Sequence, residues 1–175
     1  MDAVSELLTH VARLTKVSVE LRQELRHRVK IQNVDKGRFL HQAGSVCNRT
    51  FFITQGLLRS YYCKGEKDIT DCFAAEGEWI TATDSFMRNE PDDSYLQALE
   101  RSQVCSLTNV ELASLFERFP EMERFGRIII SQQFMQQSAR LAALRFNSAK
   151  DKCAVFCAAY RPVLAACHWA WWHPT

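Results

Sequence analysis

Hydrophobic positions near the start of the chain recur at helical spacing. Leu7, Leu8, Val11 and Leu14 form one apolar stripe. Farther on, charged residues flank Leu21 and Leu25, as on a helix with one face in water. The pattern predicts helices within residues 2–30.

From Gly37 the pattern changes to short apolar runs separated by glycine or polar turns. The runs cover residues 38–40, 50–54, 57–62, 68–73, 95–99 and 104–107. Strands this short, with glycine between them, favour an antiparallel roll or barrel over a parallel sheet. The polar stretch after the fourth run can hold a short helix, at residues 79–87, and a loop.

The last patterned segment, residues 121–146, is predicted to be one long helix. It follows a helix that begins with the capping-box spacing of Thr108 and Glu111 and is bounded by Pro120. Residues that are apolar or small, apart from one glutamine, recur at alternating spacings of three and four, as in a heptad seam. The seam residues are Phe125, Ile128, Gln132, Met135, Ala139 and Ala142, followed by Phe146.

A second apolar set, Ile130, Phe134, Leu141 and Leu144, lies on another face of this helix. One face could cover the strand domain while the other meets a partner, and we expect a homodimer through residues 121–147. The alternative, that both faces are covered within the chain, stays open.

Composition narrows the class of protein. The chain has 175 residues, 47% hydrophobic and 24% charged, so it is expected to fold. Its net charge of +2 is far from the basic excess of a dedicated nucleic-acid binder. No apolar stretch has bilayer length, and charges throughout residues 1–30 argue against a secretory signal. With seven cysteines and no tight framework, we expect reduced thiols and a cytoplasmic location without membrane contact.

Several motifs then occur in a specific order: Gly44, Phe52-Ile53, Gly56 and Gly77-Glu78. This order resembles the cyclic-nucleotide-binding domain of the Crp/Fnr family of bacterial transcription regulators, over residues 21–152. In that family two glycine turns flank a Phe/Tyr-Ile strand, and a Gly-Glu pair opens a phosphate-binding cassette.

The resemblance implies an α+β fold with a mainly β core. This would be an antiparallel β-roll, or jelly roll, with N-terminal helices and a long C-terminal dimerisation helix. It divides the chain into residues 1–120 (helices and roll), 121–147 (dimerisation helix) and 148–175 (remnant of a DNA-binding domain).

A cassette for a cyclic phosphate needs backbone N–H donors and usually an arginine, with a carboxylate for the ribose. Glu78 matches the family's ribose-binding glutamate. The arginine position before the strand near Tyr95 instead holds Asp92 and Asp93, which would repel a phosphate. Arg88 is the other candidate for the phosphate. The predicted ligand-binding residues are Gly77, Glu78, Trp79, Arg88 and Ser94.

This departure leaves the ligand open. We expect a small anionic or nucleotide-like effector, or none, and neither a cofactor nor a metal. The sequence shows neither paired catalytic carboxylates nor a Ser-His-Asp order, so no motif indicates an enzyme. His10, His27 and His41 are interpreted as surface or packing residues.

The C-terminal residues differ from the rest of the chain. Residues 145–152 resemble the family's entry into a winged helix-turn-helix, but the pattern then stops. Residues 153–175 hold three Trp and three Cys. If the codons that encode Cys167–His173 are read in the frame that begins one base earlier, they allow the sequence Leu-Gly-x-Val-Ala. This resembles the segment that starts the first helix of the family's helix-turn-helix. We hypothesise a frameshift near residues 152–156, and DNA binding only by a full-length form.

The sequence therefore predicts an effector-sensing and dimerising module of a Crp/Fnr-type transcription regulator that does not bind DNA specifically. Two alternatives stay open: a stand-alone cyclic-nucleotide-binding protein, and an interaction module that forms mixed dimers with intact regulators.

Overall fold

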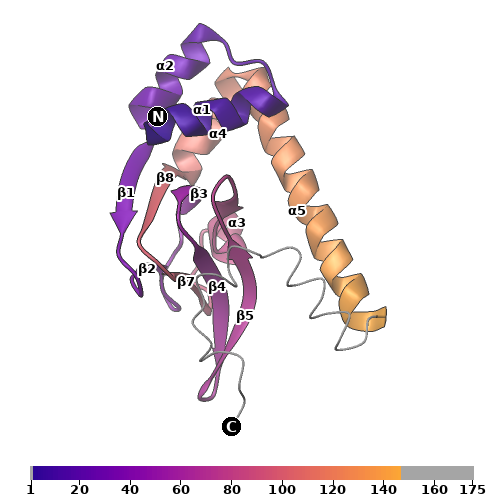
Figure 1. The fold of residues 1–175 in the computed structure, drawn as a ribbon. Helices are drawn as coiled ribbons and strands as arrows, with labels where there is room; N and C mark the ends of the chain where they lie inside the picture. Colours follow the sequence, from indigo (N-terminus) through magenta and orange to yellow (C-terminus); the bar gives the residue numbers. More distant parts are fainter. Residues whose placement is uncertain (1, 147–175) are drawn as a thin grey trace. The chain divides into compact units, whose positions relative to one another are not determined.

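The computed structural model describes residues 2–146 of the chain (Figure 1). Two helices come first, α1 (Ala3–Leu14) and α2 (Val19–Arg28), and the side chains of Asp2 and Ser18 cap their N-termini. The remaining elements are β1 (Lys30–Val34), β2 (Phe39–His41), β3 (Arg49–Gln55), β4 (Leu58–Lys64), β5 (Lys67–Ala74), β6 (Trp79–Ile80), α3 (Thr83–Arg88), β7 (Ser94–Ala98), β8 (Ser102–Thr108), α4 (Asn109–Arg118) and α5 (Pro120–Phe146).

The strands form two antiparallel sheets, which confirms the predicted roll. One sheet has the order β1-β8-β3-β6 and the other β2-β7-β4-β5. Apolar side chains from both sheets form one core between them: Val34, Phe51, Ile53, Ile80 and Val104 from the first, and Leu58, Ala74, Leu96 and Ala98 from the second. Burial of this core supplies the main force that holds the sheets together.

The outer face of the first sheet is also covered. Helix α1 packs against β3 and β8 and buries Leu7, Leu8 and Val11. Strand β3 is therefore buried on both sides, with Phe51 facing the roll and the ring of Phe52 next to His10 of α1. Burial on both faces explains why its sequence is a continuous apolar run.

The local structure differs from the sequence pattern at two places. Residues 79–87 are not one helix, because Trp79 and Ile80 pair with Phe52 and Phe51 as strand β6 and α3 begins only at Thr83. Strand β1 was not predicted, because only Val34 of its five residues is buried and its sequence shows no alternation.

The helices after the roll agree with the sequence. Thr108 and Glu111 form the reciprocal capping box of α4. Pro120 occupies the first position of α5, where its missing N–H costs nothing. Among residues 2–146, no helix combines the length and apolar character that crossing a bilayer requires.

The chain divides into two compact units, Met1–Arg124 and Phe125–Thr175. The second unit is described only as far as Phe146, so the predicted remnant at 148–175 and the frameshift hypothesis lie outside the described residues.

Candidate functional site

The Gly77–Glu78 pair forms the turn that enters β6. Gly77 has a φ of +83°, which suits glycine, and its N–H donates to the Ile53 carbonyl at 2.8 Å. The Ile53 N–H in turn donates to the Glu78 carbonyl at 3.0 Å. The Glu78 carboxylate accepts a hydrogen bond from the Ala75 N–H at 2.8 Å, so it is bound within its own turn.

Trp79, the next predicted ligand residue, packs toward the N-terminal helices. Its ring lies 5.2 Å from that of Phe52, centroid to centroid, and Phe52 also contacts His10 at 4.9 Å. The structure thus places Trp79 in an aromatic cluster between β3, β6 and α1.

Arg88 and Ser94 lie farther along the segment, on either side of a loop. Arg88 is the exposed last residue of α3, and Asn89 ends that helix in the left-handed conformation, with φ of 56°. Ser94 is buried at the start of β7, opposite Tyr62 of β4. Its O–H donates to the Asp92 carboxylate at 2.8 Å and its N–H donates to the same group at 3.2 Å.

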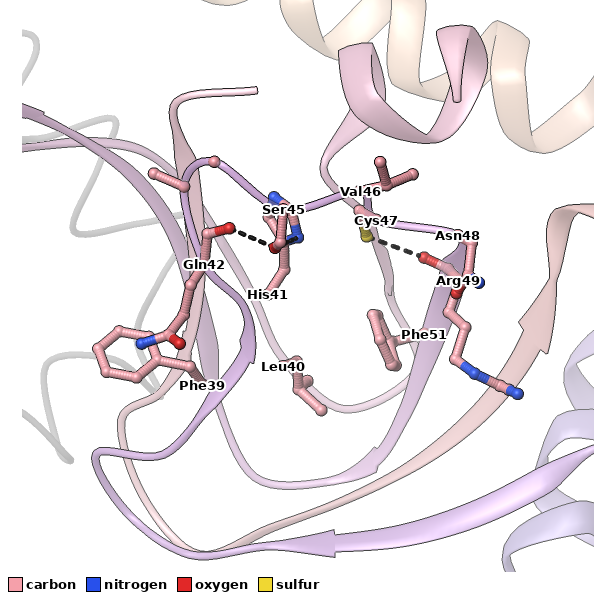
Figure 2. A pocket seen from close by; sticks show the side chains of 12 residues that line it. Phe39, Leu40, His41, Gln42, Ser45, Val46, Cys47, Asn48, Arg49 and Phe51 are labelled. Carbon is pink, nitrogen blue, oxygen red and sulfur yellow. Dashed lines mark hydrogen bonds between the residues drawn. The ribbon is translucent and has the colours of Figure 1, made fainter. Parts of the chain in front are cut away.

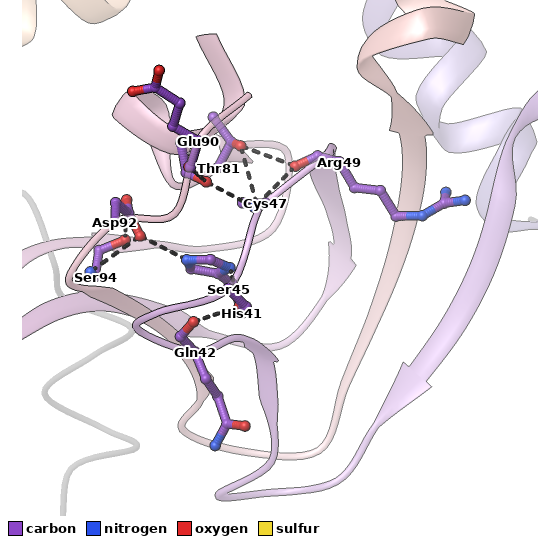
Figure 3. A network of polar contacts seen from close by, with 10 residues as sticks. His41, Gln42, Ser45, Cys47, Arg49, Thr81, Glu90, Asp92 and Ser94 are labelled. Atoms are coloured by element: carbon purple, nitrogen blue, oxygen red, sulfur yellow. Dashed lines mark hydrogen bonds and ion pairs between the residues drawn. The ribbon is translucent and has the colours of Figure 1, made fainter. Parts of the chain in front are cut away.

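The Asp92 carboxylate also binds a buried histidine. Nε2 of His41 lies 2.8 Å from Oδ1 of Asp92, and the His41 side chain is only 2% exposed (Figure 3). Because a carboxylate only accepts hydrogen bonds, the proton of this bond belongs to Nε2. Nδ1 of His41 faces the Ser45 hydroxyl at 3.3 Å.

These contacts perturb the acidity of Asp92. Burial alone would raise its pKa, but hydrogen bonds from His41 and Ser94 outweigh burial and hold the pKa of Asp92 below its ordinary value. The carboxylate is therefore charged at neutral pH and stabilised by three donors.

Main-chain contacts hold the same two loops together. The Gly44 N–H donates to the Asp92 carbonyl at 2.7 Å. The hydroxyl of Ser85, buried in α3, accepts from the Cys47 N–H at 2.8 Å and donates to the Glu90 carbonyl at 2.6 Å. The β2–β3 loop (residues 42–48) and the α3–β7 loop (residues 89–93) are thus linked by both backbone and side-chain hydrogen bonds.

Each member of the His41–Asp92 pair lines a cavity. The first, about 400 Å³, includes His41 in its lining and lies along the β2–β3 loop. Figure 2 shows residues of its lining, with His41, Ser45 and Cys47 above Leu40 and Phe51 in the view. The second cavity, about 310 Å³, is lined by Arg88 and the carboxylates Asp84, Glu90, Asp92 and Asp93, with Tyr62 and Pro91.

The predicted residues therefore fall into two groups. Gly77, Glu78 and Trp79 belong to the turn and strand bound to β3, whereas Arg88 and Ser94 flank the loop that carries Asp92. Their assignment to a ligand stays a prediction. His41 was interpreted as a surface or packing residue standing alone; it is buried, as a packing residue would be, but it does not stand alone, since it is paired with Asp92.

From the sequence, Asp92 was interpreted only as an acid that would repel a phosphate. Its partner lies 51 positions away in sequence, and no local spacing indicates such a pair. Among the described residues, no group of three or more His, Cys, Asp or Glu side chains is placed to hold a metal ion.

Comparison with known proteins gives the family context. The family profile of the cyclic nucleotide-binding domain matches residues 31–119, about half of the chain. The anaerobic regulatory protein of Pasteurella multocida is 26% identical over 125 residues, which make up 70% of this chain and 45% of that protein. The chain thus spans less than half the length of this curated relative.

Solved structures share the fold. A putative regulator of the Crp/Fnr family from Eubacterium rectale superposes with a TM-score of 0.68 at 13% identity, covering 85% of this chain and 70% of that one. A CooA mutant from Carboxydothermus hydrogenoformans gives 0.62 at 15% identity, covering 89% and 93%. The sensor domain of the regulator DNR from Pseudomonas aeruginosa gives 0.60 at 16%, covering 82% and 94%.

The β-roll, its glycine turns and the segment from β6 to β7 agree with this match, which rests on half of the chain. The family is one of non-enzymatic regulatory domains. The chain belongs to the cyclic nucleotide-binding domain family, and it shares its fold with the putative regulator of the Crp/Fnr family from Eubacterium rectale.

Proposed function

We propose that this chain is the effector-sensing module of a Crp/Fnr-type transcription regulator and that it dimerises through the helix at residues 121–147. The relatives named above include regulators and a sensor domain. DNA recognition would belong to a longer form, and this chain is not expected to read a DNA sequence.

The observation that carries the proposed dimer is the apolar surface of α5. Phe125 is buried and Ile128 half-buried, but Met135 is 61% exposed. The remaining residues of the predicted seam, Gln132, Ala139 and Ala142, are also exposed. Apolar and small side chains exposed at heptad spacing are typical of a helix that packs against a second copy.

The charges at the second cavity argue for an effector other than a simple cyclic nucleotide. A cyclic phosphate is a monoanion, and here it would face four carboxylates and a single guanidinium, that of Arg88. Like charges at such distances repel, more strongly where water is partly excluded. We therefore infer that the cassette is degenerate toward cyclic AMP while the roll and the proposed dimer helix are retained.

Light scattering on the purified chain tests the dimer. The wild type is expected to have the mass of a dimer, and Met135→Glu is expected to give monomers because it buries charges in the seam. Gln133→Glu adds the same charge at an exposed position of α5 outside both apolar sets and is the matched control. A monomeric wild type, or a Met135→Glu variant that stays dimeric, would contradict the proposal.

A further inference from the structure

Three hydrogen-bond donors converge on a single carboxylate in the cassette. Nε2–H of His41 reaches Asp92 at 2.8 Å, and the O–H and N–H of Ser94 reach it at 2.8 and 3.2 Å. The Asp92 side chain is only 12% exposed and that of His41 2%. Such a set of fixed donors is how proteins bind small oxyanions, since charge-assisted hydrogen bonds are about twice as strong as neutral ones.

The donors are held in place independently of the carboxylate. Ser94 is the first residue of β7 and pairs with Tyr62 of β4. His41 is the last residue of β2 and pairs with Leu96, which also belongs to β7. The main chain of Asp92 is separately fixed, because its carbonyl accepts from the Gly44 N–H at 2.7 Å. Removing the Asp92 side chain would therefore leave the donors preorganised around an empty position.

The surrounding charges favour a carboxylate of the chain itself over a free anion at the position between these donors. Asp84, Glu90 and Asp93 line the second cavity beside Asp92, and Arg88 is the cation among them. A free anion would be repelled by these carboxylates. A carboxylate attached to the same loop avoids the entropic cost of association, so it competes with free anions at a high effective concentration.

We propose that His41 and Ser94 form an oxyanion-binding position that the chain closes with its own Asp92 carboxylate, so that an external carboxylate or phosphate binds there only when Asp92 leaves. This contact is autoinhibitory toward an anionic ligand. Its meaning for regulation rests on the proposed sensor function. Its test requires neither a dimer nor the natural effector, so the two can fail separately.

The experiment is a chemical rescue. Thermal unfolding of Asp92→Ala is followed in increasing sodium formate and, separately, inorganic phosphate, each against sodium chloride of equal ionic strength, which controls for screening. Asp92→Ala is expected to melt below the wild type in chloride. Formate is expected to raise its melting temperature saturably, with an apparent affinity at least about tenfold above that of the wild type.

Two control variants locate the effect. Asp93→Ala removes the neighbouring exposed carboxylate and is expected to respond to formate no more than the wild type does. The double variant Asp92→Ala/Ser94→Ala loses a donor and is expected to lose the rescue. A response to formate alone assigns the position to carboxylates, whereas an equal response to phosphate extends it to phosphoryl ligands.

The proposal is overturned if Asp92→Ala responds to neither anion, if Asp93→Ala responds as strongly, or if the rescue survives loss of the Ser94 hydroxyl. Should Asp92→Ala fail to fold in chloride, recovery of the fold by formate supports the proposal. Should it fail in every buffer, Asp92→Ser, which keeps a small polar group, is measured in the same titrations and decides the question by the same criteria.

Discussion

The two halves of the segment between β5 and β7 are held in place in different ways. The first half, Gly77–Ile80, is bound by its backbone to β3 and by the ring of Trp79 to Phe52. The second half, residues 85–94, is bound to the β2–β3 loop largely by buried polar side chains, above all Ser85 and Asp92.

The first half therefore serves as scaffold, whereas the second half carries the polar groups that could bind a ligand. Backbone pairing and ring packing fix the position of the first half and leave its one carboxylate, Glu78, bound within a turn. The second half contains the buried hydroxyls of Ser85 and Ser94 and the charged acceptor Asp92, and it forms most of the lining of the second cavity. Convergent polar groups beside a cavity are typical of a ligand site, so under the proposed function we expect an effector to bind at the second half.

The largest effect is expected at Ser85, which is 1% exposed and bridges the two loops. Ser85→Ala leaves the Cys47 N–H and the Glu90 carbonyl without this partner. The Cys47 N–H is buried, whereas Glu90 is an exposed residue whose carbonyl can bind water, so the free energy of unfolding should fall by about 1–3 kcal/mol. Urea denaturation measures the loss.

Thr9→Ala is the matched control for Ser85→Ala. The Thr9 hydroxyl also donates to a main-chain carbonyl, that of Ser5 at 2.8 Å, but the residue is exposed. Water can replace this bond, so the change should stay within about 0.5 kcal/mol. Equal losses in the two variants would show that the buried Ser85 bridge contributes no more than an exposed hydroxyl bond.

Sequence patterns revealed the scaffold far better than the chemistry. The capping box at Thr108 and the long helix α5 are local signals, so they could be predicted. Strand β6 has only two residues and exists because they pair with β3, and β1 has a single buried side chain. The His41–Asp92 pair depends entirely on folding, since it joins residues 51 positions apart.

A smaller effect is expected from neutralising Asp92. Asp92→Asn keeps the shape and one acceptor oxygen but loses the charge, and should cost about 1 kcal/mol at neutral pH. The folded-state pKa of Asp92 lies below its ordinary value, so the charge stabilises the fold above the unfolded pKa. That contribution is lost as pH falls through the folded pKa.

The pH dependence provides the measurement. The difference in unfolding free energy between wild type and Asp92→Asn should narrow as pH is lowered from about 5 to below 4, where the unfolded carboxyl titrates. Asp93→Asn, at the exposed neighbouring position, should show little such change. A difference that widens toward acid would mean that the Asp92 carboxylate destabilises the fold.

The smallest effect is expected where the sequence first suggested ligand binding. Calorimetric titration with cyclic AMP or cyclic GMP should give no saturable heat for the wild type, and Arg88→Ala and Glu78→Gln should leave that result unchanged. Arg88 is one cation among four carboxylates, and the Glu78 carboxylate is bound to the Ala75 N–H, 2.8 Å away. Micromolar binding that either substitution abolishes would instead support a stand-alone cyclic-nucleotide-binding protein. It would also move the ligand chemistry to Glu78 and Arg88, because a nucleotide phosphate could then outweigh the carboxylates of the second half.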